Sequence, residues 1–339
     1  MSEKEDITFE QVLGSLLDLD TPFPPSFLYR FSDLASDELE KFQRTWSDVP
    51  AWRRIAIMED VEELGETNYT LSFEAIARYC LKDKDPGVRA IALRTLWEYD
   101  LPDIVPNLLT MVVGDENPDV RAVSASALGK YVYLGELEKL PQKSLKAIEE
   151  LLIKVINGSD TTLVRRRALE SLGYSSSKEV SPMIERAYYS GKDDMVVSAL
   201  FAMGRSANPI WRDLVIDLLD SDNPQIRTEA ARAAGELEIS RALPDLFALL
   251  DDSDDEVRLA SIWSLSQIGG EGVQEALEDL YEETSDDEEA RLIETALDNL
   301  AFTNDMQLLT MLDMDEDVFD KDVNGDFYEL HEGNEDFLN

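Results

Sequence analysis

The chain has 339 residues, of which 44% are hydrophobic and 30% are charged, and its formal net charge at pH 7 is −41. The hydrophobic fraction is enough for a sizeable buried core and excludes a disordered chain. The negative charge argues against a nucleic-acid-binding protein, which needs a basic face to replace the counterions around phosphate. No apolar run reaches the roughly 18 residues of a bilayer-spanning helix, and the charged start MSEKEDITFE lacks the apolar stretch of a secretory signal. We therefore expect a cytoplasmic protein with no membrane partner.

The acidity itself has two interpretations that the sequence leaves open. A high negative charge keeps a protein soluble, including in a saline cytoplasm, and it also attracts basic protein partners. If the negative charge contributes to binding, we expect the protein partner to be basic. The oligomeric state stays open.

Three predicted helices occupy the first 64 residues. The segments TFEQVLGSLLDL (8–19), DELEKFQRTW (37–46) and AWRRIAIMEDVEEL (51–64) have the apolar spacing of amphipathic helices. The proline-rich stretch TPFPPSFLYR (21–30) is predicted to be an extended link. We expect residues 1–64 to form an N-terminal helical cap that covers the first apolar face of the segment that follows.

From residue 65 to residue 302 a pattern recurs about every 31 residues, which is typical of stacked helical repeats. The stretch NPDVRAVSASALG (117–129) returns as NPQIRTEAARAAG (223–235). Aligning the chain on the large apolar residue of this stretch gives the anchors Val88, Val120, Val164, Met195, Ile226, Val257 and Leu292. The longest gap, between Val120 and Val164, predicts an insertion that forms a loop at 135–144.

Each anchor begins a predicted helix with a regular apolar stripe. The residue four positions later is small, which lets a neighbouring helix come close: Ala92, Ser124, Ala168, Ala199, Ala230 and Ser261. A second apolar segment, such as DIVPNLLTMVV (103–113), precedes each anchor and completes a helical hairpin. The predicted N-caps, each followed by proline, are Asp85, Asn117 and Asn223. The glycines predicted to end the helices are Gly129, Gly173, Gly204 and Gly235.

This pattern resembles the HEAT-repeat family, especially its short bacterial form found in phycobilin lyases. The resemblance rests on five anchor-plus-arginine pairs, namely Val88-Arg89, Val120-Arg121, Val164-Arg165, Ile226-Arg227 and Val257-Arg258. It implies an all-α, right-handed α-solenoid of about seven HEAT-like helical hairpins, in which the arginines pair with acidic residues between neighbouring repeats. The chain departs from the pattern at Val196, where arginine is missing, and at Leu292, where Arg291 precedes the anchor.

Catalytic motifs are missing from the sequence. Cys80 is the one cysteine and His331 the one histidine, so a disulfide, a cysteine-based zinc site and a Ser-His-Asp triad on the repeats are excluded. The di-iron hydroxylases built on HEAT-like repeats need several His–Glu pairs, which one histidine cannot supply. We expect a chain that is not an enzyme and holds no cofactor or metal, with Cys80 as a small buried hydrophobe.

What remains is a surface. Positions two and six after each anchor face away from the packed stripe, and in HEAT-like solenoids this face lines the concave side. The candidate groove residues are Arg94, Arg166, Val197, Phe201, Arg232, Leu259 and Trp263. Arginine and aromatic residues dominate protein interfaces, although Phe201 and Trp263 could also pack against adjacent repeats. The prediction is a non-enzymatic scaffold or adaptor that binds a protein or peptide in this groove. The alternative is a phycobilin-lyase-like transferase or lyase accessory subunit.

Residues 303–339 form an acidic tail that is expected to be disordered. Within it, VFDKDVNGDFYELHE (318–332) resembles a calcium-binding EF-hand loop, with Asp320, Asp322 and Asn324 at ligand positions. His331 stands where the loop needs a bidentate carboxylate. We therefore expect no specific calcium site.

Overall fold

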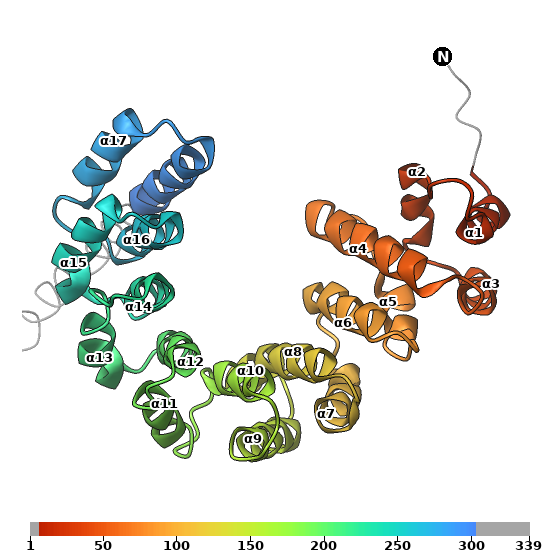
Figure 1. Ribbon diagram of the computed structural model, residues 1–339, viewed down its shortest axis with the longest axis horizontal. Coiled ribbons are helices and arrows are strands. Elements are labelled where there is room, and N and C mark those ends of the chain that lie inside the picture. The colour runs from red at the N-terminus through yellow and green to blue at the C-terminus, as the bar shows by residue number, and fades with distance from the viewer. Residues whose placement is uncertain (1–6, 303–339) are drawn as a thin grey trace, which may run out of the picture. The chain divides into compact units, whose positions relative to one another are not determined.

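The computed structural model describes residues 7–302, and every regular element in this part of the chain is a helix (Figure 1). The all-α prediction is confirmed. The predicted acidic tail, with its calcium-loop-like segment and His331, lies outside the described residues. The chain divides into two compact units, Met1–Asn208 and Pro209–Asn339. The predicted boundary between the N-terminal cap and the repeats, at residue 64, lies within the first of these units.

The first unit contains twelve α-helices in two alternating layers. They are α1 (Phe9–Leu17), α2 (Pro25–Leu28), α3 (Ser36–Trp46), α4 (Ala51–Thr67), α5 (Glu74–Cys80), α6 (Pro86–Thr95), α7 (Val105–Gly114), α8 (Pro118–Glu136), α9 (Gln142–Ile156), α10 (Thr162–Leu172), α11 (Ser181–Tyr188) and α12 (Asp193–Arg205). We call α5, α7, α9 and α11 first helices, and α6, α8, α10 and α12 second helices. Each second helix packs against the next one, so they form a continuous layer within this unit (Figure 1).

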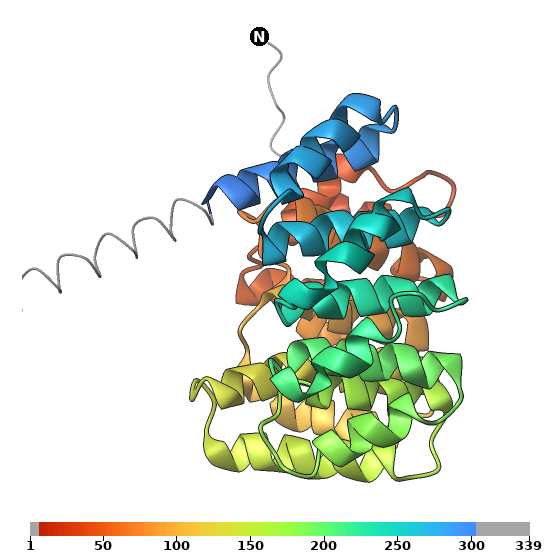
Figure 2. The same cartoon turned by 90° about the vertical axis from the view of Figure 1, so that its left-hand side faces the viewer.

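The second unit repeats this arrangement with shorter first helices. Its elements are α13 (Arg212–Ile216), α14 (Pro224–Glu236), α15 (Leu243–Ala248), α16 (Asp255–Ile268), α17 (Val273–Glu283) and a helical stretch at 287–302. The second helices α14 and α16 pack on each other, and α13 and α15 cover them. In each unit the helices lie across the direction of stacking (Figure 2). Short 3-10 turns connect elements in both units, at Tyr29–Phe31, Leu96–Glu98, Pro102–Ile104, Pro209–Trp211, Ser240–Ala242 and Leu249–Asp251.

Small residues in the middle of the second helices make this close stacking possible. The six residues predicted from the repeat are all fully buried: Ala92, Ser124, Ala168, Ala199, Ala230 and Ser261. Five of the seven anchors are buried as well. The exceptions are Met195 and Leu292, which are half-buried, because the next residues, Val196 and Ile293, occupy the buried place in those two helices.

The prediction that four glycines end the second helices is confirmed for Gly173, the C-cap of α10, and wrong for the other three. Gly129, Gly204 and Gly235 lie inside helices, and none of the four has a positive φ. Their role is close approach. A Cβ on Gly173 would lie 2.9 Å from the Cα of Ala202, and one on Gly235 would lie 2.8 Å from the Trp263 ring. These positions need glycine because the neighbouring second helix leaves no room for a side chain.

The predicted insertion loop at 135–144 is also wrong. The additional residues lengthen two helices, since α8 has 19 residues and α9 has 15, and only 137–141 connect them. Tyr131, Val132 and Gly135 in the added part of α8 are buried, and a Cβ on Gly135 would meet the side chain of Leu145 at 2.8 Å. The longer hairpin therefore extends the apolar core.

Local sequence signals set the other helix starts. The side chains of Asp85, Asn117 and Asn223 accept hydrogen bonds from backbone N–H groups in the first turn, as predicted for N-caps followed by proline. At the N-terminus α1, α3 and α4 are confirmed as helices, but the expected extended link contains the short helix α2 and a 3-10 turn. Helix α4 packs on α6, and α3 packs on α5, so both continue the two layers.

Candidate interaction surface

Arginines at the start of the second helices pair with carboxylates in the turn that leads to the next second helix or, for Glu289, in the first turn of that helix. Arg89 shows the geometry: Nε donates to Asp115 Oδ2 at 2.8 Å and Nη2 donates to Oδ1 at 2.7 Å. We call the pairs of this kind the arginine ladder. They are Arg54–Asp83, Arg89–Asp115, Arg121–Asp160, Arg227–Asp252 and Arg258–Glu289. The ladder that the family resemblance implied is thus present at four of the five predicted arginines, and Arg54 adds a further pair.

Three ladder carboxylates, those of Asp115, Asp160 and Asp252, are held in their charged form by a lowered pKa. Hydrogen bonds from Arg121 lower the pKa of Asp160, and hydrogen bonds from Arg227 lower the pKa of Asp252, against the opposing effect of burial. For Asp115 burial is the largest influence and raises the pKa. The hydrogen bonds from Arg89 and from the backbone of Asn117 together outweigh it, so the pKa of Asp115 is lowered. These groups stabilise the stack of repeats.

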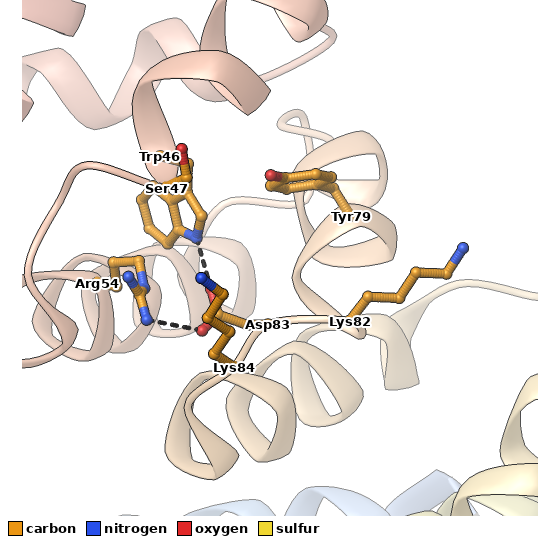
Figure 3. Close-up of a pocket in the computed structure, with 7 residues that line it drawn as sticks. All are labelled: Trp46, Ser47, Arg54, Tyr79, Lys82, Asp83 and Lys84. Atoms are coloured by element: carbon orange, nitrogen blue, oxygen red, sulfur yellow. Dashed lines mark hydrogen bonds and ion pairs between the residues drawn. The ribbon is translucent and has the colours of Figure 1, made fainter.

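Figure 3 shows the first ladder pair, beside a cavity of about 120 Å3. Asp83 accepts hydrogen bonds from Arg54 Nη2 and from Trp46 Nε1, both at 2.9 Å, and from the backbone N–H of Asp85 at 2.8 Å. Its side chain is only 6% exposed. Ser47, Tyr79, Lys82 and Lys84 complete the lining. Because the carboxylate is satisfied by three donors from the chain itself, we assign the pair a structural role.

The three arginines predicted for the groove form ion pairs with acids of their own or a neighbouring helix. Arg94 on α6 donates to both carboxylate oxygens of Glu62 on α4, at 2.6 and 2.7 Å. Arg166 on α10 lies between two second helices, where Nε donates to Ser198 Oγ at 2.8 Å. The remaining contacts are Arg166–Asp194 at 3.0 Å, Arg232–Glu256 at 3.3 Å and Arg232–Glu229 at 4.0 Å. These arginines link neighbouring repeats.

The four apolar groove candidates are half-buried and form two separate pairs. Val197 and Phe201 lie one turn apart on α12 in the first unit, and Leu259 and Trp263 lie one turn apart on α16 in the second unit. Trp263 lies over Gly235 of α14, which matches the alternative interpretation that it packs against an adjacent repeat.

On the second helices of the first unit the structure brings together a row of aromatic side chains. The ring centroids of Tyr133 on α8 and Tyr174 after α10 are 5.2 Å apart. The Arg205 guanidinium of α12 lies 5.5 Å from the Tyr174 ring and 5.0 Å from the Phe201 ring. We call Tyr133, Tyr174, Phe201 and Arg205 the aromatic row. It crosses three successive repeats, and Tyr133 at its end is 46% exposed.

Sequence reasoning found Phe201 but missed the other three members of the row. They lie ten to thirteen residues after their anchors, near the ends of the second helices. The sequence analysis assigned a surface only to the positions two and six residues after each anchor, so it did not reach them. An aromatic or arginine residue near the end of three successive second helices was the signal that could have found them.

Within the described part of the chain, no group of three or more His, Cys, Asp or Glu side chains is placed to hold a metal ion. Cys80 is buried as predicted, and burial raises the pKa of its thiol, so the thiol stays protonated. No helix in residues 7–302 has the length and apolar character needed to span a membrane.

A family model for HEAT repeats matches residues 74–152 and 212–298. Several solved structures are similar in fold. The Escherichia coli protein YibA is 19% identical with a TM-score of 0.45, over 81% of this chain and 96% of its own. The CpcE–CpcF complex of phycocyanin lyase from Nostoc sp. PCC7120 is 20% identical with a TM-score of 0.43, over 67% of this chain and 94% of its own. Human deoxyhypusine hydroxylase is 15% identical with a TM-score of 0.37, over 87% and 96%.

No curated protein matches the sequence. The two segments that match the family model fall one in each unit, and each contains paired first and second helices. Both segments also carry ladder arginines, among them Arg89 and Arg227. Residues 74–152 and 212–298 are therefore HEAT repeats.

Proposed function

We propose that the protein is a non-enzymatic scaffold that binds a protein or peptide on the second-helix layer of its first unit. The aromatic row is the centre of this surface. Solenoids of stacked repeats bind extended partners along such layers, since each repeat adds one more strip of surface.

The observation that supports this proposal is the continuity of the aromatic row. Tyr133, Tyr174 and Phe201 belong to three different repeats, and Arg205 lies over two of these rings. Tyrosine, phenylalanine and arginine are enriched in protein interfaces, and the aromatic rings bury a large area at a low cost in side-chain entropy. A row that is held in place by ring contacts loses little further freedom when a partner binds.

A second feature supports a basic partner. Helix α4 carries the carboxylates Glu59, Asp60, Glu62, Glu63 and Glu66 within two turns. Burial, together with the charges of Glu63 and Glu59, raises the pKa of Asp60, which shows that negative charge is concentrated there. A cavity of about 270 Å3 lies beside this cluster, and Glu62 and Glu66 contribute to its lining together with Arg94, the partner of Glu62. Lysine or arginine side chains of a partner would relieve this repulsion.

The non-enzymatic part of the proposal rests on the sequence, whose one histidine is His331 in the tail. The alternative, a phycobilin-lyase-like transferase, has only the family resemblance in its favour.

Site-specific photo-crosslinking tests the proposal. Tyr133 is replaced by the photoreactive residue p-benzoylphenylalanine in the protein's native cells, and crosslinked products are identified by mass spectrometry. We expect one discrete protein partner, which is lost when Phe201→Ser is introduced in addition because the row is then interrupted. Thermal unfolding of Phe201→Ser is measured in parallel to show that the fold persists.

Tyr189 provides the matched control, because it is an equally large aromatic residue, is 66% exposed and directly follows α11 in the first-helix layer. The same replacement at Tyr189 should capture no comparable product. Equal capture at both positions, or capture at Tyr133 that is unaffected by Phe201→Ser, would show that the row is not the binding surface.

A further inference from the structure

The arginine ladder has one incomplete position, at Arg165 on α10. Four of the five ladder arginines direct Nε at a carboxylate, as Arg121 does to Asp160 at 2.9 Å. Arg165 Nε instead donates to the backbone carbonyl of Ile156 at 2.8 Å, and no carboxylate within residues 7–302 pairs with this arginine. Its two terminal nitrogens have no acceptor in the described chain.

The missing acid can be placed at Ser190. In three ladder pairs the carboxylate stands two residues before an N-cap and accepts a hydrogen bond from the backbone N–H of that cap, as Asp115 does from Asn117 at 2.9 Å. Ser190 stands two residues before Lys192, the N-cap of α12, and its Oγ accepts from the backbone N–H of Lys192 at 3.3 Å. The position is thus the same, but a neutral hydroxyl replaces the carboxylate.

One repeat further along the sequence, serine again occupies the acid position, at Ser221, where it accepts from the N-cap of α14. In that repeat the arginine is missing too, because Val196 stands where the sequence pattern places it. With Val196 in place of the arginine and Ser221 in place of the acid, that repeat contains no unpaired ladder charge. At Arg165, by contrast, the positive charge is retained without its acid.

A cavity of about 210 Å3 surrounds this unpaired arginine, and its charged lining is entirely positive. Arg165, Arg186 and Lys192 contribute three cations, while no carboxylate is among the lining residues, in a chain whose net charge is −41. Buried apolar side chains form one part of the wall, namely Ile156, Leu169, Met183 and Ala187, and the neutral residues Asn157, Thr162, Ser190 and Met195 form the rest. One water occupies about 30 Å3 in the liquid, so the cavity admits a group of several heavy atoms.

From these observations we infer that the cavity binds a carboxylate supplied from outside, in the form of the free C-terminus of a peptide with an apolar last side chain. The chain itself shows that a carboxylate fits the arginine at this position, since five ladder pairs hold one. The planar guanidinium matches two carboxylate oxygens, and the apolar wall accommodates the adjoining side chain. The site is independent of the aromatic row, and either can be correct without the other.

The test uses the full chain and three small probes at low ionic strength. N-acetyl-leucine carries the carboxylate and the apolar side chain, N-acetyl-leucinamide is its neutral counterpart, and inorganic phosphate is the competing anion. The Arg165 Nε–H signal is assigned in the NMR spectrum with Arg165→Lys and followed during titration. We expect N-acetyl-leucine to shift it saturably, with a dissociation constant on the order of millimolar, and the amide to leave it unchanged.

The decisive variant is Ser190→Asp, which supplies the missing carboxylate from the chain. It should weaken N-acetyl-leucine binding by roughly tenfold or more and raise the melting temperature, because Arg165 gains an internal partner. Ser190→Asn has the same shape without the charge and should change neither quantity appreciably. Lys192→Gln, an exposed substitution that leaves Arg165 intact, should weaken binding by a smaller factor.

Three results would overturn the inference: equal binding of the amide, tighter binding of phosphate than of N-acetyl-leucine, or unchanged binding in Ser190→Asp. The second of these would make the cavity a phosphate site.

Discussion

Asp252 shows what a single ladder residue contributes. It accepts two hydrogen bonds from Arg227 at 2.8 Å and one from the backbone N–H of Asp254 at 2.9 Å, and its side chain is 8% exposed. Asp252→Asn would leave the guanidinium of Arg227 without its counter-charge. We therefore expect this substitution to lower the free energy of unfolding at pH 7 by about 3 kcal/mol, measured by urea denaturation.

The difference between the wild type and Asp252→Asn should depend on pH in a defined direction. The folded pKa of Asp252 lies below its usual value of 3.8, so its charge stabilises the fold above that pH. The contribution is lost as the pH falls through the folded pKa. The difference should thus be constant near neutrality and shrink below about pH 4; a difference that persists undiminished would contradict the charge assignment. Glu150→Gln, whose partner Lys146 is 77% exposed, should have little effect at any pH.

Substitution of two glycines by alanine should change the free energy of unfolding in opposite directions. A Cβ on Gly173 would lie 2.9 Å from the backbone Cα of Ala202 on the neighbouring helix, whereas one on Gly14, inside α1, would have no heavy atom within 4 Å. Gly173→Ala should lower the free energy of unfolding by about 1 to 3 kcal/mol because the two helices must move apart. Gly14→Ala should raise it by roughly 0.5 to 1 kcal/mol. Denaturant unfolding of both variants measures how much the close approach at Gly173, the C-cap of α10, contributes to stability.

At the scale of single helices, the first-turn caps differ in a way that can be tested. Asn117 caps α8 through two backbone N–H groups, but Ala35 stands at the N-cap of α3 in extended conformation with no side chain able to accept one. Asn117→Ala should reduce stability by about 1 kcal/mol, and Ala35→Ser should increase it by up to about 1 kcal/mol. Thermal unfolding followed by circular dichroism measures both. Equal effects of the same sign would show that the caps do not determine these helix starts.

Helix starts were predictable from the sequence because their cause is local. Asp85 and Asn117 satisfy backbone groups only two or three residues away, so a short sequence window contains the whole interaction. Helix ends were not predictable in the same way. Gly129 lies within α8 because the added turns of that helix bury Tyr131 and Val132, and this depends on a second long helix, α9, that the alignment treated as an insertion.

The same distinction explains how much of the candidate surface was predictable. Ladder arginines follow their anchors directly, so the repeat located Arg89 and Arg121, and the resemblance to HEAT repeats implied that they pair with acidic residues. The partner of Arg165 could not be judged from the arginine alone, since its absence becomes visible only when Ser190 is known to occupy the acid position. The contact between Tyr133 and Tyr174 depends on the packing of α8 against α10, and the sequence does not determine how such side chains meet.

For the whole molecule, the net charge of −41 predicts how partner binding responds to salt. If the partner captured at Tyr133 is basic, its dissociation constant should rise steeply between low and physiological ionic strength, because exposed charges are screened beyond roughly 8 to 10 Å. Fluorescence anisotropy at several salt concentrations measures this. A dissociation constant that is independent of salt would assign the affinity to the aromatic row and remove the role proposed for the carboxylates of α4.

Hydrogen–deuterium exchange of the full chain, with and without the partner captured at Tyr133, tests the central claim most directly. A scaffold that binds along its second-helix layer should show slower exchange on partner binding in α8, α10 and α12, where the aromatic row lies. The first helices α7, α9 and α11 should exchange as in the free protein. Protection confined to α7, α9 and α11, with α8, α10 and α12 unchanged, would contradict the account.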